Sequence, residues 1–135
     1  EKFEALTKRL GEQYSKYEAL PGKFVNGDAT QGENIADLGG VVMGFEAVKK
    51  TAQYKNKEKI SGLSPEQRFF LGYAYAWMVN IKPESLANQL LTDVHAPAKY
   101  RINGVVENMP EFHKAFNVKA GSKMRRTDKE LVSIW

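Results

Sequence analysis

The chain has 135 residues, of which 42% are hydrophobic and 27% charged, and it contains no cysteine. This length and composition allow one globular domain with a buried core and argue against wholesale disorder, while the lack of cysteine excludes disulfides and thiolate metal sites. The net charge of +4 does not by itself indicate an anionic partner, because acidic residues are interleaved with the basic ones.

The first half of the chain predicts two long helices separated by a short extended segment. Apolar residues recur at three- and four-residue steps over 2–19, which predicts an amphipathic helix that Pro21-Gly22 ends. Residues 23–26 are expected to be extended. A second helix is predicted from about 31 to 54, and we expect the pair Gly39-Gly40 inside it to permit close packing of another helix.

The second half begins with a strong helix start after a polar loop over 55–62. Ser64 is a good N-cap, Pro65 suits the first helical position, and Gln67 completes a capping box. The helix that follows is dense in aromatic residues over 69–78, and we expect these to be buried on more than one face.

Shorter elements complete the chain: a helix over 83–92, an extended segment over 102–106, a short helix over 110–116 and an extended tail over 132–135. In the first of these, Leu86, Leu90 and Leu91 are expected to face inward. We find no repeat, no linker and no apolar run of the roughly 20 residues that a membrane-spanning helix needs. The fold class predicted is therefore mainly α, with a few short extended segments.

Two carboxylates form the first candidate for chemistry. Glu33 and Asp37 lie four residues apart, so a helix places them one turn apart on the same face. Such a pair suits a zinc site in which one carboxylate binds the metal and the other orients a histidine ligand. On the spacing alone, a capping box between Thr30 and Glu33 with Asp37 merely solvated is the favoured interpretation, and only residues elsewhere in the chain can reverse it.

His95 and Arg101 form the second candidate. A histidine on a loop that ends at Pro97 can donate a hydrogen bond to an oxyanion, and Asp93 is placed to orient its ring. The alternatives are a structural histidine and, for Arg101, a surface ion pair with Asp93 or Glu107.

Three further positions are assigned local roles. His113 is expected to be an exposed helical residue, and Asn34 and Gly104 are expected to serve the local backbone.

These motifs occur in the order and spacing of a known family. The chain resembles the C-terminal part of the catalytic domain of the neprilysin family of zinc metallopeptidases, which includes neprilysin, endothelin-converting enzyme and bacterial endopeptidase O. The residues that carry the resemblance are Gly-Glu-Asn-Ile-Ala-Asp at 32–37, Trp77, Thr-Asp-Val-His-Ala-Pro at 92–97, Tyr-Arg-Ile-Asn-Gly at 100–104 and Trp135.

The resemblance implies a role for each site residue. Glu33 would be a zinc ligand, and Asp37 would be a partner of the ligands that does not itself touch the metal. The residue that matches His95 stabilises the transition state in the family, and the one that matches Arg101 holds a backbone carbonyl of the substrate. Asp93 is a supporting residue. The fold implied is the helical C-terminal portion of a zincin-type catalytic domain.

One family motif is absent. The other two zinc ligands and the general base come from a His-Glu-x-x-His helix, and the two histidines here, His95 and His113, do not form it. We therefore expect 1–135 to be a C-terminal piece of the catalytic domain that neither binds zinc tightly nor acts alone, since catalytic zinc uses about three protein ligands. Its partners would be the upstream remainder of the polypeptide and peptide substrates.

The intact enzyme is expected to hold one zinc ion and to hydrolyse internal bonds of oligopeptides. The lack of cysteine suggests a bacterial relative, for which a periplasmic or cell-envelope location is favoured and a cytoplasmic one stays open. We expect no membrane contact from this segment.

Two other functions were weighed. The first is a helical protein-interaction module in which Glu33 only caps a helix. The second is nucleic-acid binding, suggested by the pI near 9.2 but disfavoured because basic and aromatic residues do not alternate in any stripe.

Overall fold

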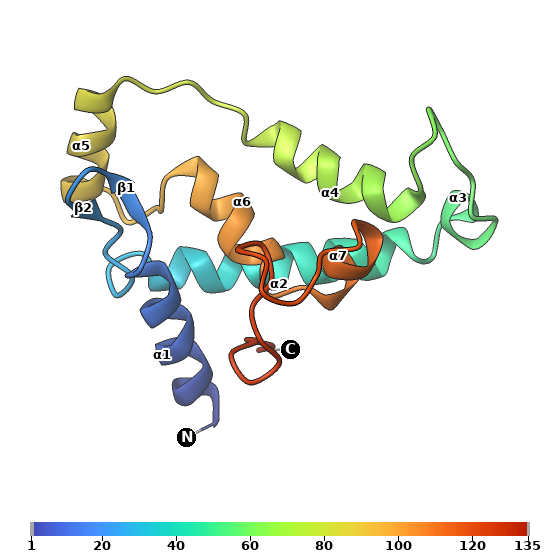
Figure 1. The fold of residues 1–135 in the computed structure, drawn as a ribbon, viewed down its shortest axis with the longest axis horizontal. Helices are drawn as coiled ribbons and strands as arrows, with labels where there is room; N and C mark the ends of the chain where they lie inside the picture. The colour runs from blue at the N-terminus through green and yellow to red at the C-terminus, as the bar shows by residue number, and fades with distance from the viewer. Residues whose placement is uncertain (1, 135) are drawn as a thin grey trace.

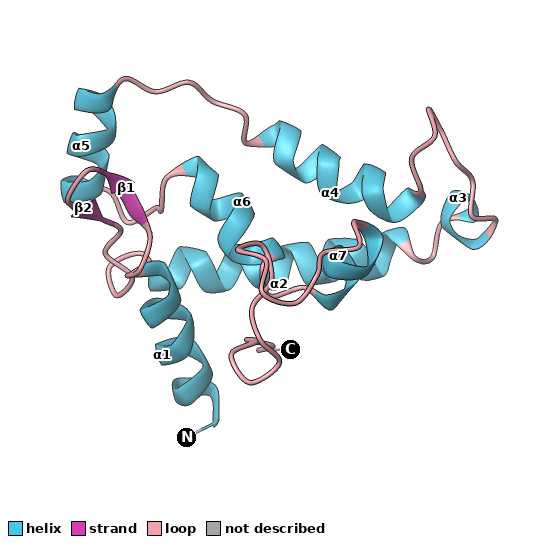
Figure 2. Ribbon diagram, in the orientation of Figure 1, coloured by secondary structure: helices cyan, strands magenta, loops and turns pink. Residues whose placement is uncertain are grey.

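The computed structural model describes residues 2–134, and its secondary structure is mainly helical (Figures 1 and 2). The elements in order are α1 (Lys2–Tyr14), β1 (Glu18–Leu20), β2 (Lys23–Phe24), α2 (Gln31–Val48), α3 (Ala52–Lys55), α4 (Pro65–Ala76), α5 (Pro83–Thr92), α6 (Ala98–Val106) and α7 (Pro110–Ala115). The two strands form an antiparallel hairpin. The predicted fold class is confirmed.

Helix α2 is the central element of the molecule. It packs against α1, α4 and α6, while α7 packs against α4 and α5 lies beside the hairpin (Figure 1). The core between these helices consists of Leu10, Tyr14, Val25, Leu38, Val41, Phe45, Phe70, Ala96, Tyr100, Val105, Val106, Met109 and Val132. The α2–α6 packing brings the N-terminal half of α2 next to the first turn of α6.

Close packing of α1 and α6 depends on one glycine. A Cβ atom at Gly104 would lie 2.5 Å from the ring of Tyr14, which is fully buried. The ring of Tyr17 stacks on that of Tyr100, with 4.5 Å between centroids. Gly104 therefore serves the packing of two helices rather than the local backbone alone.

Two helix ends differ from the prediction. Helix α1 ends at Tyr14 rather than near residue 19, because Glu18–Leu20 pairs with the second strand across a turn in which Gly22 has φ +70°. The helix predicted over 31–54 breaks after Val48, because Thr51 is extended and its side chain accepts a hydrogen bond from the Tyr54 amide, which starts α3. Local hydrogen bonding overrides the apolar periodicity in both places.

The segment 102–106 was predicted to be extended and is helical. Helix α6 begins at Ala98, directly after Pro97, whose carbonyl accepts from the amides of Tyr100 and Arg101. The β-branched residues of the segment favour strands in general. Here the buried residues Tyr100, Gly104 and Val105 recur at helical spacing, and the packing of this face selects a helix.

Helix α4 begins as predicted but is less buried than expected. Ser64 and Gln67 form the capping box, with Pro65 in the first turn. Phe70 is 3% exposed, whereas Tyr75 is 76% exposed. The aromatic side chains therefore pack on one side of the helix only, against α2 and α7.

Some other predicted placements are also wrong. Leu91 in α5 is exposed, because that helix packs its Leu90 side against the core. Of the glycine pair, Gly39 is buried, whereas a Cβ at Gly40 would meet no described atom within 4 Å, so only Gly39 faces the packed interior. His113 is buried rather than exposed, since its Nε2 lies 3.1 Å from the Glu107 carbonyl oxygen, and burial lowers its pKa.

The tail is not a strand in its described part. Val132 is buried, and its amide donates to Oδ1 of Asn108 at 3.0 Å. Trp135 lies outside the described residues. No described helix has both the length and the apolar character needed to cross a bilayer.

A buried carboxylate joins α1 to α6. The hydroxyl of Tyr17 donates to Glu107 at 2.6 Å, and Nε2 of Gln13 lies 3.4 Å from the same oxygen. Burial raises the pKa of Glu107 above its ordinary value, although the bond from Tyr17 opposes this. The same burial, with the Glu107 charge nearby, raises the pKa of Tyr17.

This environment predicts a pH-dependent effect of Glu107→Gln. Because folding raises the carboxyl pKa, the contribution of Glu107 to native stability is greatest below the unfolded pKa of about 4.3. That contribution is lost as the pH rises through the folded pKa. Glutamine accepts the bond from Tyr17 without a buried charge, so the variant should gain stability relative to the wild type between pH 4 and 7. Urea unfolding at pH 4 and at pH 7 measures the difference in the free energy of unfolding between the variant and the wild type. A variant that loses relative stability over this range would contradict the interpretation.

Candidate active site

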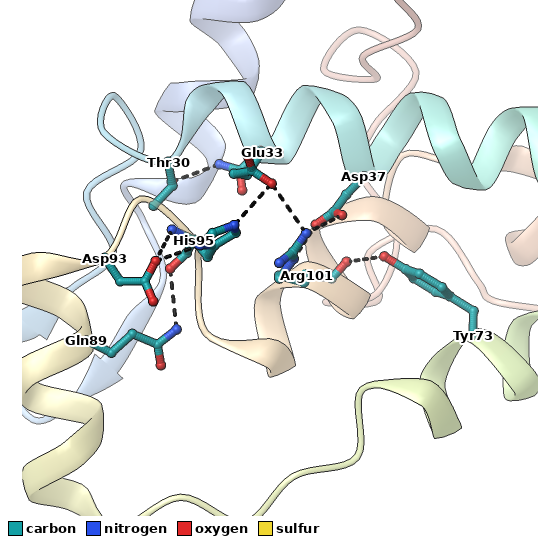
Figure 3. Close-up of polar contacts among 9 residues, drawn as sticks. Thr30, Glu33, Asp37, Tyr73, Gln89, Asp93, His95 and Arg101 are labelled. Carbon is teal, nitrogen blue, oxygen red and sulfur yellow. Dashed lines mark hydrogen bonds and ion pairs between the residues drawn. The ribbon is translucent and has the colours of Figure 1, made fainter.

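The first turns of α2 carry the two candidate carboxylates. Thr30 precedes the helix but makes no side-chain cap bond there. Its hydroxyl donates to the Asn26 carbonyl at 2.9 Å and accepts from the side-chain nitrogen Nδ2 of Asn34 at 2.9 Å. The capping box proposed for Thr30 and Glu33 is therefore wrong. Glu33 points away from the backbone of the first turn and towards α6 and the loop before it (Figure 3).

Asp37 and Arg101 form a two-bond ion pair in the site. Nε and Nη2 of Arg101 each donate to a different oxygen of Asp37 at 2.7 Å. Both side chains are largely buried, with exposed fractions of 11% for Asp37 and 13% for Arg101. The hydrogen bonds to Asp37 raise the pKa of Arg101. The partner expected for Arg101 as a surface residue was Asp93 or Glu107, and the structure shows Asp37 instead.

Glu33 contacts both candidate donors. Its Oε2 atom lies 3.3 Å from Nε2 of His95 and 3.7 Å from Nη2 of Arg101 (Figure 3). Glu33 and His95 are 39% and 42% exposed, so this part of the site is open to solvent. Glu33, Asp37, His95 and Arg101 therefore share one location.

Asp93 fixes the other side of the histidine ring. Its Oδ1 atom lies 2.6 Å from Nδ1 of His95 and accepts from the His95 amide at 2.9 Å. These two bonds, the amide first, lower the pKa of Asp93. A doubly protonated ring can donate to Asp93 and Glu33 together, whereas a neutral ring can donate to one of them.

Tyr73 of α4 and Trp77, which directly follows that helix, complete the environment of Arg101, and the sequence had indicated a core position for both. The guanidinium carbon lies 4.1 Å from the ring centroid of Trp77, and the Tyr73 hydroxyl donates to the Arg101 carbonyl at 2.8 Å. Their spacing of four residues, one helical turn, was the available signal. Trp77, His95 and Arg101 also line a cleft of about 400 Å³ with Val79 and Ile81.

The described residues do not make a complete metal site. Nowhere among residues 2–134 do three or more His, Asp or Glu side chains converge as a metal would require. A catalytic zinc needs about three protein ligands. Glu33 has the right chemistry for one of them and is accessible, so this chain alone fits a single ligand position rather than a whole site.

The comparison with protein families identifies the chain. The model of peptidase family M13 matches residues 1–132. The chain belongs to peptidase family M13. The resemblance inferred from the motifs is thereby confirmed.

Relatives of this family member are much longer. Neprilysin-1 of Caenorhabditis elegans is 39% identical over 137 residues, which cover 97% of this chain and 18% of the relative. Endothelin-converting enzyme 1 of Homo sapiens is 38% identical over 138 residues, covering 100% and 18%. The chain thus spans about a fifth of the length of these relatives.

Solved M13-type structures share the fold. The Mycobacterium tuberculosis zinc metalloprotease Zmp1, in complex with an inhibitor, superposes with a TM-score of 0.88 at 34% identity, over 99% of this chain and 21% of that protein. PepO from Lactobacillus rhamnosis gives a TM-score of 0.81 at 31% identity, over 98% and 20%.

The contacts predict that the two carboxylates of α2 differ in their effect on stability. Asp37→Asn removes a charge partner from the largely buried Arg101, so the free energy of unfolding should fall by roughly 1.5–3 kcal/mol. Glu33→Gln alters a solvent-exposed pair and should change it by less than about 0.5 kcal/mol. Urea denaturation measures both variants, and equal losses would show that the Asp37–Arg101 pair is not the structural one.

Proposed function

We propose that this chain forms one side of the active site of a longer zinc metalloendopeptidase that hydrolyses internal bonds of oligopeptides. The observation that carries the proposal is the position of Glu33, whose accessible carboxylate lies between His95 and Arg101. The names of the relatives support it, since Zmp1 is described as a zinc metalloprotease.

Glu33 is assigned as one ligand of the zinc ion. The remaining protein ligands would come from polypeptide outside these 135 residues, in line with the incomplete set found here. When bound, zinc supplies Lewis-acid polarisation of the scissile carbonyl and an activated water. The exposed apolar residues Met43, Met78 and Leu91 support contact with further polypeptide.

His95 is assigned as the donor that stabilises the oxyanion. Its ring lies next to Glu33 and is oriented by Asp93, so a proton on Nε2 is directed towards the site of the reaction. A preorganised donor costs no reorganisation when charge develops on the carbonyl oxygen. Asp93 is assigned the role of holding the ring in this orientation.

Arg101 is assigned to the substrate backbone. Asp37 occupies Nε and Nη2, and Nη1 makes no hydrogen bond to any described residue. That nitrogen can donate to a peptide carbonyl without breaking the pair with Asp37. Asp37 then positions Arg101, in addition to its assigned role as the partner of the zinc ligand Glu33.

The roles predict different consequences for Glu33→Ala and His95→Ala in the longer enzyme. Removal of a metal ligand should lower the zinc content of the purified protein and abolish activity. Removal of an oxyanion donor should leave zinc bound and lower kcat by about 10²–10³-fold. Metal analysis and peptide-cleavage kinetics measure both.

The matched control is Glu46→Ala, which removes an exposed glutamate later in α2 and should change neither zinc content nor kcat. The 135-residue chain alone should bind zinc only weakly. Equal zinc loss in the Glu33 and His95 variants, or tight zinc binding by the chain alone, would contradict the assignment.

A further inference from the structure

Arg101 stands on the first turn of a short helix that follows a loop. Residues 93–97 precede α6, and the helix has nine residues. First-turn residues lack part of the hydrogen-bonding of a helix interior, and helix ends open more readily than helix centres. The Arg101 amide donates to the carbonyl of Pro97, the last residue of that loop, so the position of the Arg101 main chain depends on the loop unless a neighbouring element holds it.

Helix α4 supplies that support through the hydroxyl of Tyr73. It donates to the Arg101 carbonyl oxygen at 2.8 Å, and this contact links α4 to α6 at the level of the site (Figure 3). The ring of Trp77, which directly follows α4, packs against the guanidinium group of the same residue. A single helix face thus holds both the main chain and the side chain of Arg101.

The hydroxyl is suited to a permanent donor role. Burial, with the Asp37 carboxylate nearby, raises the pKa of Tyr73 well above its ordinary value, so the group stays protonated at neutral and alkaline pH. Tyr73 is half-buried between α2 and α6 and packs against the core.

We propose that Tyr73 is a positioning residue that acts through Arg101: its hydroxyl fixes the first turn of α6 so that the free Nη1 of Arg101 meets the substrate carbonyl. The inference rests on the proposed function, because it assumes that Arg101 binds the peptide backbone. A contact made equally to substrate and transition state affects KM rather than kcat. Loss of the Tyr73 hydroxyl should therefore weaken substrate binding and spare turnover.

The test uses the full-length zinc enzyme with an internally quenched oligopeptide as substrate. Tyr73→Phe removes one oxygen and keeps the ring, so it should raise KM by about threefold to tenfold, the range expected for one hydrogen bond, with kcat and zinc content unchanged. Tyr75→Phe is the matched control on the same helix, because Tyr75 is exposed; its KM should equal that of the wild type.

A double-mutant cycle with Arg101→Lys separates positioning from general destabilisation. A lysine has one nitrogen and no planar fork, so it cannot hold Asp37 through two nitrogens while a third faces the substrate, and Arg101→Lys should raise KM by itself. If Tyr73 acts through Arg101, adding Tyr73→Phe to Arg101→Lys should raise KM no further. Thermal unfolding of each variant shows whether the fold is kept.

Each outcome decides between the proposals. A Tyr73→Phe enzyme with normal KM, beside an impaired Arg101→Lys enzyme, overturns the inference and leaves the proposed function standing. The same KM increase from Tyr73→Phe in both backgrounds also overturns it, because Tyr73 would then act independently of Arg101. An Arg101→Lys enzyme with normal KM overturns the substrate role of Arg101 and the inference with it.

Discussion

The paired hydrogen bonds between Asp37 and Arg101 are the interaction on which the site depends. They connect α2 to α6, helices that are 64 residues apart in sequence at this point. Both groups are largely removed from water, where an unpaired charge would be costly. The pair therefore fixes the distance and rotation of the two helices locally, and Glu33 and the loop that carries His95 are placed as a consequence.

A second close approach, one turn further along α6, makes that geometry possible. Gly104 lies three residues after Arg101 and admits the ring of Tyr14 where a larger residue would collide with it. The buried Tyr17–Glu107 bond joins the segments that directly follow these two helices. Helix α6 is thus held between α1 and α2, and its first turn presents Arg101 to the carboxylates.

The sequence predicted the helices with explicit start signals well, and the four residues that it singled out for chemistry lie together in the structure. The capping box at Ser64 and the prolines at 65, 83 and 110 each mark a helix that the structure contains. The segment at 102–106 was misassigned because its β-branched residues suit a strand, and only packing against α1 and α2 selects the helix. Burial of His113 follows from a tertiary bond to Glu107 that no local pattern reveals. The contact between Tyr73 and Arg101 could not be predicted for the same reason, since aromatic residues at helical spacing ordinarily indicate a core position.

The charges of the site explain why Glu33 is the carboxylate suited to a metal. Asp37 has its cation in Arg101, at 2.7 Å through two bonds, and Asp93 has its partner in His95 at 2.6 Å. Glu33 lies farther from both donors, at 3.3 and 3.7 Å, and each of those donors already serves another carboxylate. Its negative charge is therefore the least compensated of the three. Because Thr30 bonds to Asn34 instead of the backbone of the first turn, no capping interaction holds the Glu33 side chain back. A divalent cation completed by ligands from elsewhere would neutralise this charge, whereas binding at Asp37 or Asp93 would first have to break an existing pair.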